Sequence, residues 1–369
     1  MPHYGRLDQA SMTNSQPGQI TLREILQQPE LWPTSLERIA KLQHPTASGH
    51  RHTVICGAGT SAYAASAVAA VWEGAAAIPS TDLLLYSREE LSQLVGGFVT
   101  NGLLVSLARS GNSPESIGVI ARLQTLFPQV SHLAITCNEN GRLAHMKGVL
   151  PVILDARTND RSLVMTGSFS NLTLAGMAVT RREFLAKHLP TVTATVNGAF
   201  PALEATARKL ASRAAARLMV LSCAALVPLG LEARLKVLEM TAGRVAAASE
   251  TFLGIRHGPM SFLRSDSIVL CVLSSDIHRR RYEEDLIHEL RQKKLGHLVV
   301  VGGPDSDQSL GHEFVPAMAP ELPDNLRVPF EIVFPQLLAY HLSLAAHLDP
   351  DDPSPDGVIT RVVRQFRLH

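Results

Sequence analysis

The sequence has almost no net charge, because 34 lysines and arginines nearly balance 33 aspartates and glutamates and leave a formal charge of +1. Binding to nucleic acid depends on a strongly basic surface, so no nucleic-acid partner is expected. Aromatic residues are also few, at 5%, whereas 46% of the chain is hydrophobic. This composition is typical of a globular protein with a sizeable core.

Cysteine is scarce, and its four positions form no CxxC pair. Three of them lie in or beside apolar segments of the chain, and all four are far apart in sequence: Cys56, Cys137, Cys223 and Cys271. Structural zinc sites and disulfide frameworks need cysteines at short, regular spacings. We therefore expect reduced thiols in the core and no metal site.

Long uninterrupted hydrophobic runs are also missing. The longest apolar stretch, residues 218–231, is interrupted by Pro228, and the first 19 residues contain no apolar segment of the kind found in signal peptides. The sequence therefore predicts a cytoplasmic protein with no membrane span.

Short apolar segments followed by loops and helical patterns make up the first half of the chain. Five of them are too uninterrupted to be half-exposed strands, namely TVICG (53–57), DLLLY (82–86), GLLVSLA (102–108), HLAITC (132–137) and VLPVILD (149–155). Such runs are typical of parallel strands that helices cover on both faces. We expect a doubly wound α/β lobe over residues 21–200, with helices at its start and a polar leader before it, over residues 1–20.

The second half repeats this alternation after two helical stretches, over 172–188 and 202–216. The expected order is a strand, a helix, a strand, a charged helix and a strand, at 217–223, 231–248, 267–275, 283–294 and 297–303. A final helix or strand is expected at 358–366, after a loop rich in proline and aspartate. The sequence therefore predicts a second doubly wound lobe over residues 201–369.

Two loops with small residues follow predicted strands of the first lobe. In an open parallel sheet, ligands bind beyond the carboxyl ends of the strands. Gly59, Thr60 and Ser61 lie in the first such loop, where backbone N–H groups can approach an anion at the start of a helix. Gly57 and Ala62 extend this segment to the dinucleotide pattern G-x-G-x-x-G/A, so a nicotinamide-dependent enzyme is one alternative.

The loop after the third strand gives a stronger signal for phosphate. Ser110 and Ser113 are three residues apart, Gly111 and Asn112 lie between them, and Arg109 precedes them. Hydroxyl and backbone donors at a helix that begins at residue 114 suit a phosphate monoester. Ser113 is also a good helix cap, but capping does not account for Ser110 or for a second loop of this kind. The two loops together favour a phosphate ester over a dinucleotide.

Three charged residues of the second half lie at helical spacing. Glu232, Lys236 and Glu239 are separated by four and three residues, so they share one helix face. Spacing alone favours a solvent-exposed polar stripe over a catalytic set. His257 lies in an Arg-His-Gly-Pro turn. A histidine at such a position either has a structural role in the turn or transfers protons near neutral pH.

Taken together, these segments resemble the sugar-isomerase (SIS) family, which includes the isomerase half of glucosamine-6-phosphate synthase. Residues 108–113 are similar to the family's phosphate loop S-x-S-G-x-[ST], with Ala108 in place of the first serine, and GAGTS supplies a further phosphate-binding serine, Ser61. LEARLKVLE resembles the segment with the family's lysine and catalytic glutamate. The resemblance implies catalytic roles for Lys236, Glu239 and, through the HGP turn, His257.

Six segments resemble one branch of this family, the galactosamine-6-phosphate deaminase/isomerases, also called tagatose-6-phosphate ketose/aldose isomerases. They are REILQQPELW, RSGNSPES, NDRSLVMTGSFSNL, LEMTAGRV, SETFLGIRHGPMSF and SPDGVITRVV. The resemblance implies deamination of galactosamine-6-phosphate without a metal or redox cofactor, in a homodimer with the site near the subunit interface. A ketose/aldose isomerase that does not deaminate, or a non-catalytic sugar-phosphate sensor, are the alternatives.

Two segments depart from the family pattern. Residues 221–230, LSCAALVPLG, lack the glycine-rich, serine-bearing turn of relatives, so no substrate contact is expected there. The assisting C-terminal lysine of the synthase has no counterpart, and Arg361 is the nearest cation.

Overall fold

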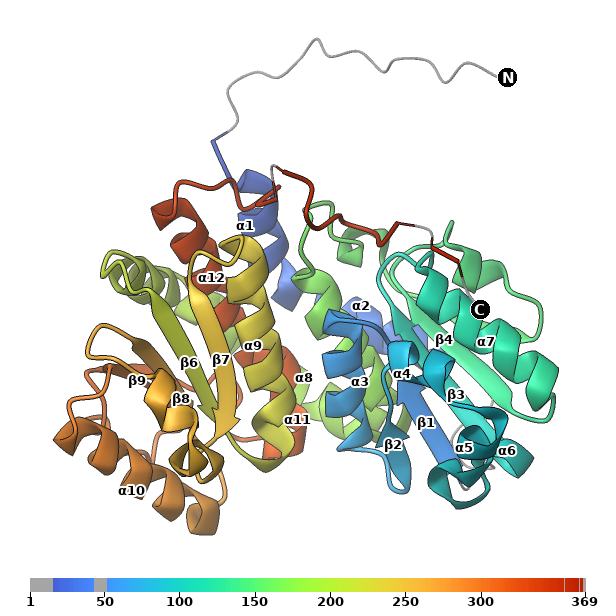
Figure 1. Cartoon of the computed structure of the whole chain (residues 1–369), viewed down its shortest axis with the longest axis horizontal. Coiled ribbons are helices and arrows are strands. Elements are labelled where there is room, and N and C mark those ends of the chain that lie inside the picture. Colours follow the sequence, from blue (N-terminus) through green and yellow to red (C-terminus); the bar gives the residue numbers. More distant parts are fainter. Residues whose placement is uncertain (1–15, 43–51, 355, 365, 368–369) are drawn as a thin grey trace.

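The computed structural model describes residues 16–42, 52–354, 356–364 and 366–367. Two parallel five-stranded sheets lie on opposite sides of the molecule, with α3 (Thr60–Ala69) and α9 (Val227–Met240) between them (Figure 1). This arrangement confirms the predicted α/β fold with two doubly wound lobes. Much of the apolar core is continuous from the first sheet to the second.

The first sheet has the strand order β2-β1-β3-β4-β5. Its central strand β3 is buried along its whole length, as expected for a sheet covered on both faces. The strands are β1 (His52–Cys56), β2 (Ala75–Ala77), β3 (Gly102–Ala108), β4 (Ser131–Thr136) and β5 (Val149–Ile153). The helices of this part are α3, α4 (Ser80–Leu85), α5 (Arg88–Gln93), α6 (Phe98–Asn101) and α7 (Pro114–Leu126).

The second sheet has the order β7-β6-β8-β9-β10, which is the first order repeated. Strand β6 therefore corresponds to β1, β8 corresponds to β3, and the loop from β8 to α10 corresponds to the loop from β3 to α7. The strands are β6 (Arg217–Ser222), β7 (Ala246–Thr251), β8 (Ile268–Val272), β9 (His297–Gly302) and β10 (Glu313–Pro316), and the helices of this part are α9 and α10 (Ile277–Gln292).

A long helix, α8 (Gly167–Ala211), joins the two lobes and bends at Arg181, whose φ and ψ of −126° and 24° are not helical. It combines the two helical stretches predicted separately. Its first turn is capped by the buried Asp160 carboxylate, which accepts the backbone N–H groups of Thr166, Gly167 and Ser168 at 2.8–3.1 Å. Four helices pack around α8 or the core beside it, namely α1 (Gln19–Leu26), α2 (Gln28–Ala40), α11 (Asp324–Glu331) and α12 (Val333–Ala345).

One predicted strand of the first lobe is wrong. Residues 82–86 are not a strand, because Ser80–Leu85 forms α4, and β2 is the short alanine segment before it. In α4 only Leu83 is buried among the three leucines, and Leu85 is 82% exposed. A run of three leucines does not separate a strand from a short helix.

The second lobe also differs from its prediction. The helix expected over 231–248 ends at Met240, and residues 246–248 begin β7 instead. Strand β10 was not predicted, and 358–364 form neither a helix nor a strand, against the expected final element. The four cysteines are free thiols, and three of them are buried.

The stretch Asp324–Ala345 is long and apolar enough to span a membrane by composition. In the structure it is split between α11 and α12, and 89% of its most apolar window is buried inside the protein. Its hydrophobicity is therefore explained by its position in the core.

Candidate active site

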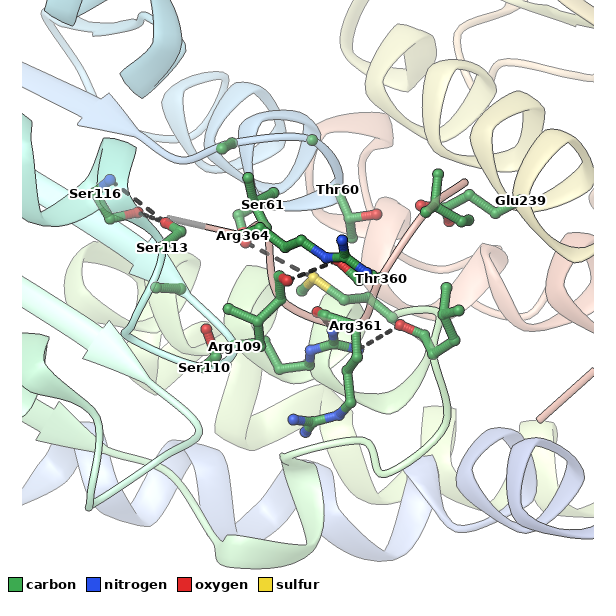
Figure 2. Close-up of a pocket in the computed structure, with 18 of the residues that line it drawn as sticks. Thr60, Ser61, Arg109, Ser110, Ser113, Ser116, Glu239, Thr360, Arg361 and Arg364 are labelled. Carbon is green, nitrogen blue, oxygen red and sulfur yellow. Dashed lines mark hydrogen bonds between the residues drawn. The ribbon is translucent and has the colours of Figure 1, made fainter. Parts of the chain in front are cut away.

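A cavity of about 560 Å³ lies at the carboxyl edge of the first sheet. It is lined by the loops that follow β1 and β3, by Glu239 of α9 and by the C-terminal segment 357–364. Figure 2 shows the serines of the β3 loop on one side of this cavity and Glu239 on the other. Most predicted site residues are among those that line it, namely Gly59, Thr60, Ser61, Arg109, Ser110, Ser113 and Glu239.

The loop after β3 is held in a tight turn. Gly111 has a positive φ of 63°, and the Asn112 N–H donates to the Ser110 hydroxyl at 3.2 Å. Ser113 is the N-cap of α7 and accepts the Ser116 N–H at 3.4 Å, while its own hydroxyl donates to the Ser116 hydroxyl at 2.8 Å. Gly111 and Asn112 belong to this loop but are not among the residues that line the cavity. The predicted cap is confirmed, and both serines also line the cavity.

The loop after β1 brings the backbone of α3 close to the same cavity. A side chain at Gly57 would place its Cβ 2.5 Å from the Ser61 carbonyl oxygen, so only glycine fits this turn. Gly59 has a positive φ of 56° with open space around its Cβ position. Ser61 lies in the first turn of α3 and contacts the Met165 sulfur at 4.0 Å. The helix therefore presents its positive end and a hydroxyl to one side of the cavity.

The lysine–glutamate set on α9 is buried and does not form a solvent-exposed stripe. Lys236 and Glu232 are 0% exposed. The Lys236 ammonium group lies 2.5 Å from a Glu239 carboxylate oxygen, 3.1 Å from the Thr60 hydroxyl and 3.3 Å from a Glu232 carboxylate oxygen. Thr60 comes from α3 of the first lobe, so this cluster connects the two lobes directly behind the cavity.

Burial and charge act in opposite directions on this cluster. Burial raises the pKa of Glu232 to about 8, although the neighbouring ammonium group lowers it. Burial alone would lower the pKa of Lys236, but the two carboxylates more than offset it, and its pKa is raised. Lys236 is therefore held as a cation beside Glu239, the member of the set that reaches the cavity.

Arg109 and Arg361 fix the floor of the cavity. Arg109 is 6% exposed, and its guanidinium donates to the carbonyls of Leu163, at 3.1 Å, and of Arg361. Arg361 in turn donates to the Asp160 carbonyl and, at 2.7 Å, to the Asn159 side chain. Both arginines thus hold the C-terminal segment against the first lobe, and burial lowers the pKa of Arg109.

His257 lies outside this cavity. It is an exposed residue just after β7, whereas Glu239 lies just before that strand. A strand of six residues spans about 17 Å, so β7 separates the two side chains within one copy of the chain. Of the three predicted catalytic residues, the structure brings Glu239 and Lys236 together and places His257 elsewhere.

Several lining residues were not predicted. Leu163 and Met165 form an apolar wall, and Thr360 and Arg364 come from the C-terminal segment. Arg364 is exposed and is shown beside Thr360 in Figure 2. The sequence predicted a final helix or strand over 358–366, and the resemblance drew attention only to Arg361, so nothing in the sequence marked Arg364 as a lining residue.

Comparison with known proteins identifies the family. A Streptomyces coelicolor protein of the AgaS group is 36% identical over 95% of both chains. A D-galactosamine-6-phosphate deaminase AgaS from a Shewanella species is 33% identical over 95% of this chain and 91% of the relative. The chain belongs to the AgaS family. No protein-family model matches it.

Solved structures agree with this assignment to the AgaS family. The tagatose-6-phosphate ketose/aldose isomerase from Escherichia coli superimposes with a TM-score of 0.81 at 28% identity, covering 94% of this chain and 99% of that one. The C-terminal domain of glucosamine-fructose-6-phosphate aminotransferase from Francisella tularensis shares the fold with a TM-score of 0.74 at 16% identity, over 90% of this chain and 98% of the domain. The resemblance to the SIS family is therefore confirmed.

Proposed function

We propose that this AgaS-family enzyme converts galactosamine-6-phosphate and water to tagatose-6-phosphate and ammonia. The observation that carries the proposal is the single cavity that joins the Ser110–Ser113 loop of the first lobe to Glu239 of the second. A phosphate group at one end fixes the sugar chain, so that its first two carbons lie near the carboxylate at the other.

The serines and helix termini of the first lobe supply the phosphate site. Ser61, Ser110 and Ser113 offer hydroxyl donors, and the backbone amides of Gly111 and Asn112 lie in the same loop. The first turns of α3 and α7 add two positive helix ends on this side of the cavity. Held in this way, the phosphate leaves the sugar carbons free to extend toward Glu239.

Glu239 carries out the proton shift. In the open-chain amino sugar, its carboxylate removes the proton from C2 while the C1 carbonyl oxygen gains one, which gives an enolamine. Return of the proton to C1 produces a 2-imine, and water adds to this carbon and releases ammonia, leaving the ketose phosphate. Lys236, bonded to Glu239, keeps the carboxylate oriented and stabilises the negative charge that develops on the sugar oxygen.

His257 would reach the cavity from a second copy of the chain, where it would shuttle the proton of ring opening. Leu253 beside it is 50% exposed. Next to the cavity, the C-terminal segment exposes further apolar side chains, namely Val358, Ile359, Val363 and Phe366. Contact between these two apolar regions in a homodimer would cover both and bring His257 to the partner's cavity, in a protein that we expect to be cytoplasmic.

The reaction is tested by an ammonia-release assay with three substrates, galactosamine-6-phosphate, glucosamine-6-phosphate and tagatose-6-phosphate. We expect ammonia from the first alone, together with a ketose phosphate in equal amount. Interconversion of aldose and ketose phosphates without ammonia would instead support a non-deaminating isomerase. Binding of the sugar phosphates with no turnover of any would support a sensor.

The role of Glu239 is tested by Glu239→Gln, which keeps the size of the side chain and removes the base. Turnover should fall at least about 1,000-fold while galactosamine-6-phosphate still binds, because the phosphate contacts remain. Glu183→Gln, an exposed change on α8, is the matched control and should keep full activity. If Glu239→Gln kept most of the turnover, Glu239 would not be the base that moves the proton between C2 and C1.

The shared site is tested by mixing two inactive chains, Glu239→Gln and His257→Asn. A mixed dimer contains one cavity with both native residues, so random exchange should restore roughly a quarter of the native activity. No restoration after confirmed subunit exchange, or an active monomer in sedimentation, would contradict the dimer.

A further inference from the structure

A second cavity, of about 460 Å³, lies at the edge of the second sheet where its strands begin. This edge is opposite to the one formed by the carboxyl ends of the strands. Its residues come from the segments that lead into β6, β8, β9 and β10 and from the end of α10. No carboxylate is among the described residues that line it, which are Arg213, Ser265, Arg291, Lys294, Gly296, His297 and His312. Three permanent cations and two imidazoles therefore share one hollow, and none of them lines the cavity described above.

The cations of this cavity lack acidic partners within the described part of the chain. No ion pair involves Arg213, Arg291 or Lys294 there. The nearby carboxylate of Glu313 is already 2.6 Å from the Lys209 ammonium group. The ends of α8 and α10 favour cations at this place through the helix dipole, but that effect does not account for the imidazoles.

The arginine and the two histidines are held in defined positions. Arg291 donates through one guanidinium nitrogen to the carbonyls of Ser309, at 2.6 Å, and Leu310, at 3.1 Å, which fixes the head group. The His312 Nδ1 accepts the Leu298 N–H at 2.9 Å, so a neutral ring carries its proton on Nε2 as a donor. The His297 ring stacks on it with centroids 4.8 Å apart.

His297 also has an unsatisfied polar atom. Its Nε2 is buried and makes no hydrogen bond, and its nearest acid is a Glu313 oxygen at 3.4 Å. Burial, followed by the charge of Arg213, lowers the pKa of His297, and burial and Arg291 lower that of His312. Glu313 is thus the acid nearest to the imidazoles, and Arg213, Arg291 and Lys294 make no ion pair in the described part of the chain.

We propose that this cavity binds the phosphate group of a small phosphorylated metabolite, at a site separate from the proposed active site. Arg213, Arg291 and Lys294 supply the charge, and the His312 imidazole and the Ser265 hydroxyl supply directed donors. The volume is large enough for a sugar attached to the phosphate.

The test uses the full chain and inorganic phosphate as the probe, with Ser110→Asp present to repel phosphate from the first-lobe cavity. The informative variant is Arg213→Glu/Lys294→Glu, two exposed changes at the cavity. Its matched control is Arg182→Glu/Lys187→Glu, two exposed changes on α8 that alter the net charge equally. Calorimetry should show phosphate binding to the parent and the control, weakened at least about tenfold in the cavity variant.

Two further measurements test the phosphate site independently. Ser265→Asp places a carboxylate in the cavity from an exposed turn and should weaken phosphate in the same way. In crystals soaked with tungstate, the anomalous peak should lie between Arg291 and His312. Equal binding by the cavity variant and the control, or no phosphate binding to the Ser110→Asp parent, would overturn the proposal. In the native background, without Ser110→Asp, the deaminase activity of Arg213→Glu/Lys294→Glu should equal that of the unsubstituted chain, so this result is independent of the proposed reaction.

Discussion

The carboxyl edges of the two sheets have the same strand order but different occupants. After β3, Ser110 and Ser113 line an open cavity. After β8, the corresponding loop holds an internal carboxylate: Asp324 accepts the Ser274 hydroxyl at 2.5 Å and the N–H and hydroxyl of Ser275 at 2.8 and 2.9 Å. The loop after β8 also borders a smaller cavity, of about 260 Å³. The difference is that the hydroxyls of Ser274 and Ser275 already donate to Asp324, whereas no carboxylate of the chain bonds to Ser110 or Ser113 in the described part of the structure.

This difference would account for the position of the proposed catalytic residues of the second lobe, which lie on a helix and not in a loop. Asp324 also pairs with Arg327 at 3.0 Å and Arg279 at 3.4 Å, so its charge is balanced within the lobe. Together with the missing glycine-rich turn at 221–230, this loop leaves α9 and the C-terminal segment as the parts of the second half of the chain that line the cavity. The repeated fold thus has one edge where the proposed phosphate site lies and one where an internal carboxylate takes the corresponding hydrogen bonds.

The largest effect should come from opening the filled loop. Asp324→Ala leaves the buried Arg327 without one of its two carboxylate partners, and should lower the free energy of unfolding by about 3–5 kcal/mol in urea titrations. Asp305→Ala, an exposed change near the same loop, is the control and should cost less than about 0.5 kcal/mol. A decrease of less than about 1 kcal/mol in the free energy of unfolding of Asp324→Ala would contradict this. It would mean that Asp324 does not occupy this loop in the place that an external anion takes in the first lobe.

The second prediction concerns the open loop. Ser110→Ala/Ser113→Ala removes two hydroxyls that face the cavity and should lower kcat/KM about 10- to 100-fold, mainly through KM, because the phosphate group is bound in the ground state as well. The comparison is Ser274→Ala in the second lobe, which should reduce stability and leave KM unchanged. Similar decreases of kcat/KM in both variants would show that the two loops do not differ in substrate binding.

The third prediction concerns Glu232, which lies where the lobes meet. Its pKa is about 8 in the folded protein and 4.5 in the reference state, so the folded state binds a proton that the unfolded state releases. Stability should therefore fall as the pH rises from about 4.5 to 8. In Glu232→Gln, this decline in the free energy of unfolding should be smaller by about 1–2 kcal/mol. The full pKa shift would give a larger difference, but the ionisation of Glu232 is coupled to the charge of Lys236.

Urea titrations of both chains at pH 5, 6, 7 and 8 measure this difference. Glu183→Gln, an exposed change of the same kind, should follow the native pH profile. Parallel profiles for Glu232→Gln and the native chain would show that Glu232 stays ionised in the folded protein.

The smallest effect should come from Arg364 at the exposed side of the cavity. Arg364→Gln should raise KM about three- to tenfold, because an exposed cation near a dianion contributes roughly 0.6–1.4 kcal/mol in water. Arg367→Gln, three residues later and outside the lining, is the control. The effect should shrink with added salt, and a KM that is unchanged at low salt would place Arg364 outside the binding site.

Short-range spacing made much of this site predictable. The two serine loops follow apolar strands within a few residues, and the helical period places Glu232, Lys236 and Glu239 on one face. The spacing did not reveal that this face is buried, because burial depends on α3, which lies more than 160 residues earlier in the chain. The roles of Glu239 and His257 remain predictions from resemblance and from the proposed chemistry.

The errors in the fold come from edge strands and from irregular chain. Strands β2 and β7 are rich in alanine and have few β-branched residues, so they lack the pattern of the central strands. The C-terminal segment has no regular element, and its position is set by contacts of Arg109 and Arg361 with distant carbonyls. Such long-range hydrogen bonds leave no periodic signal in the sequence.

The C-terminal segment crosses from the second lobe back to the first, as its red trace in Figure 1 shows. Every strand in the described chain ends by residue 316, whereas 357–364 form one wall of the cavity. During synthesis, both sheets can therefore form before the active site is complete. A chain ending at residue 356 should fold and melt nearly as the native protein does, yet its cavity would lack a wall, and a fusion tag placed at this end would sit beside the substrate.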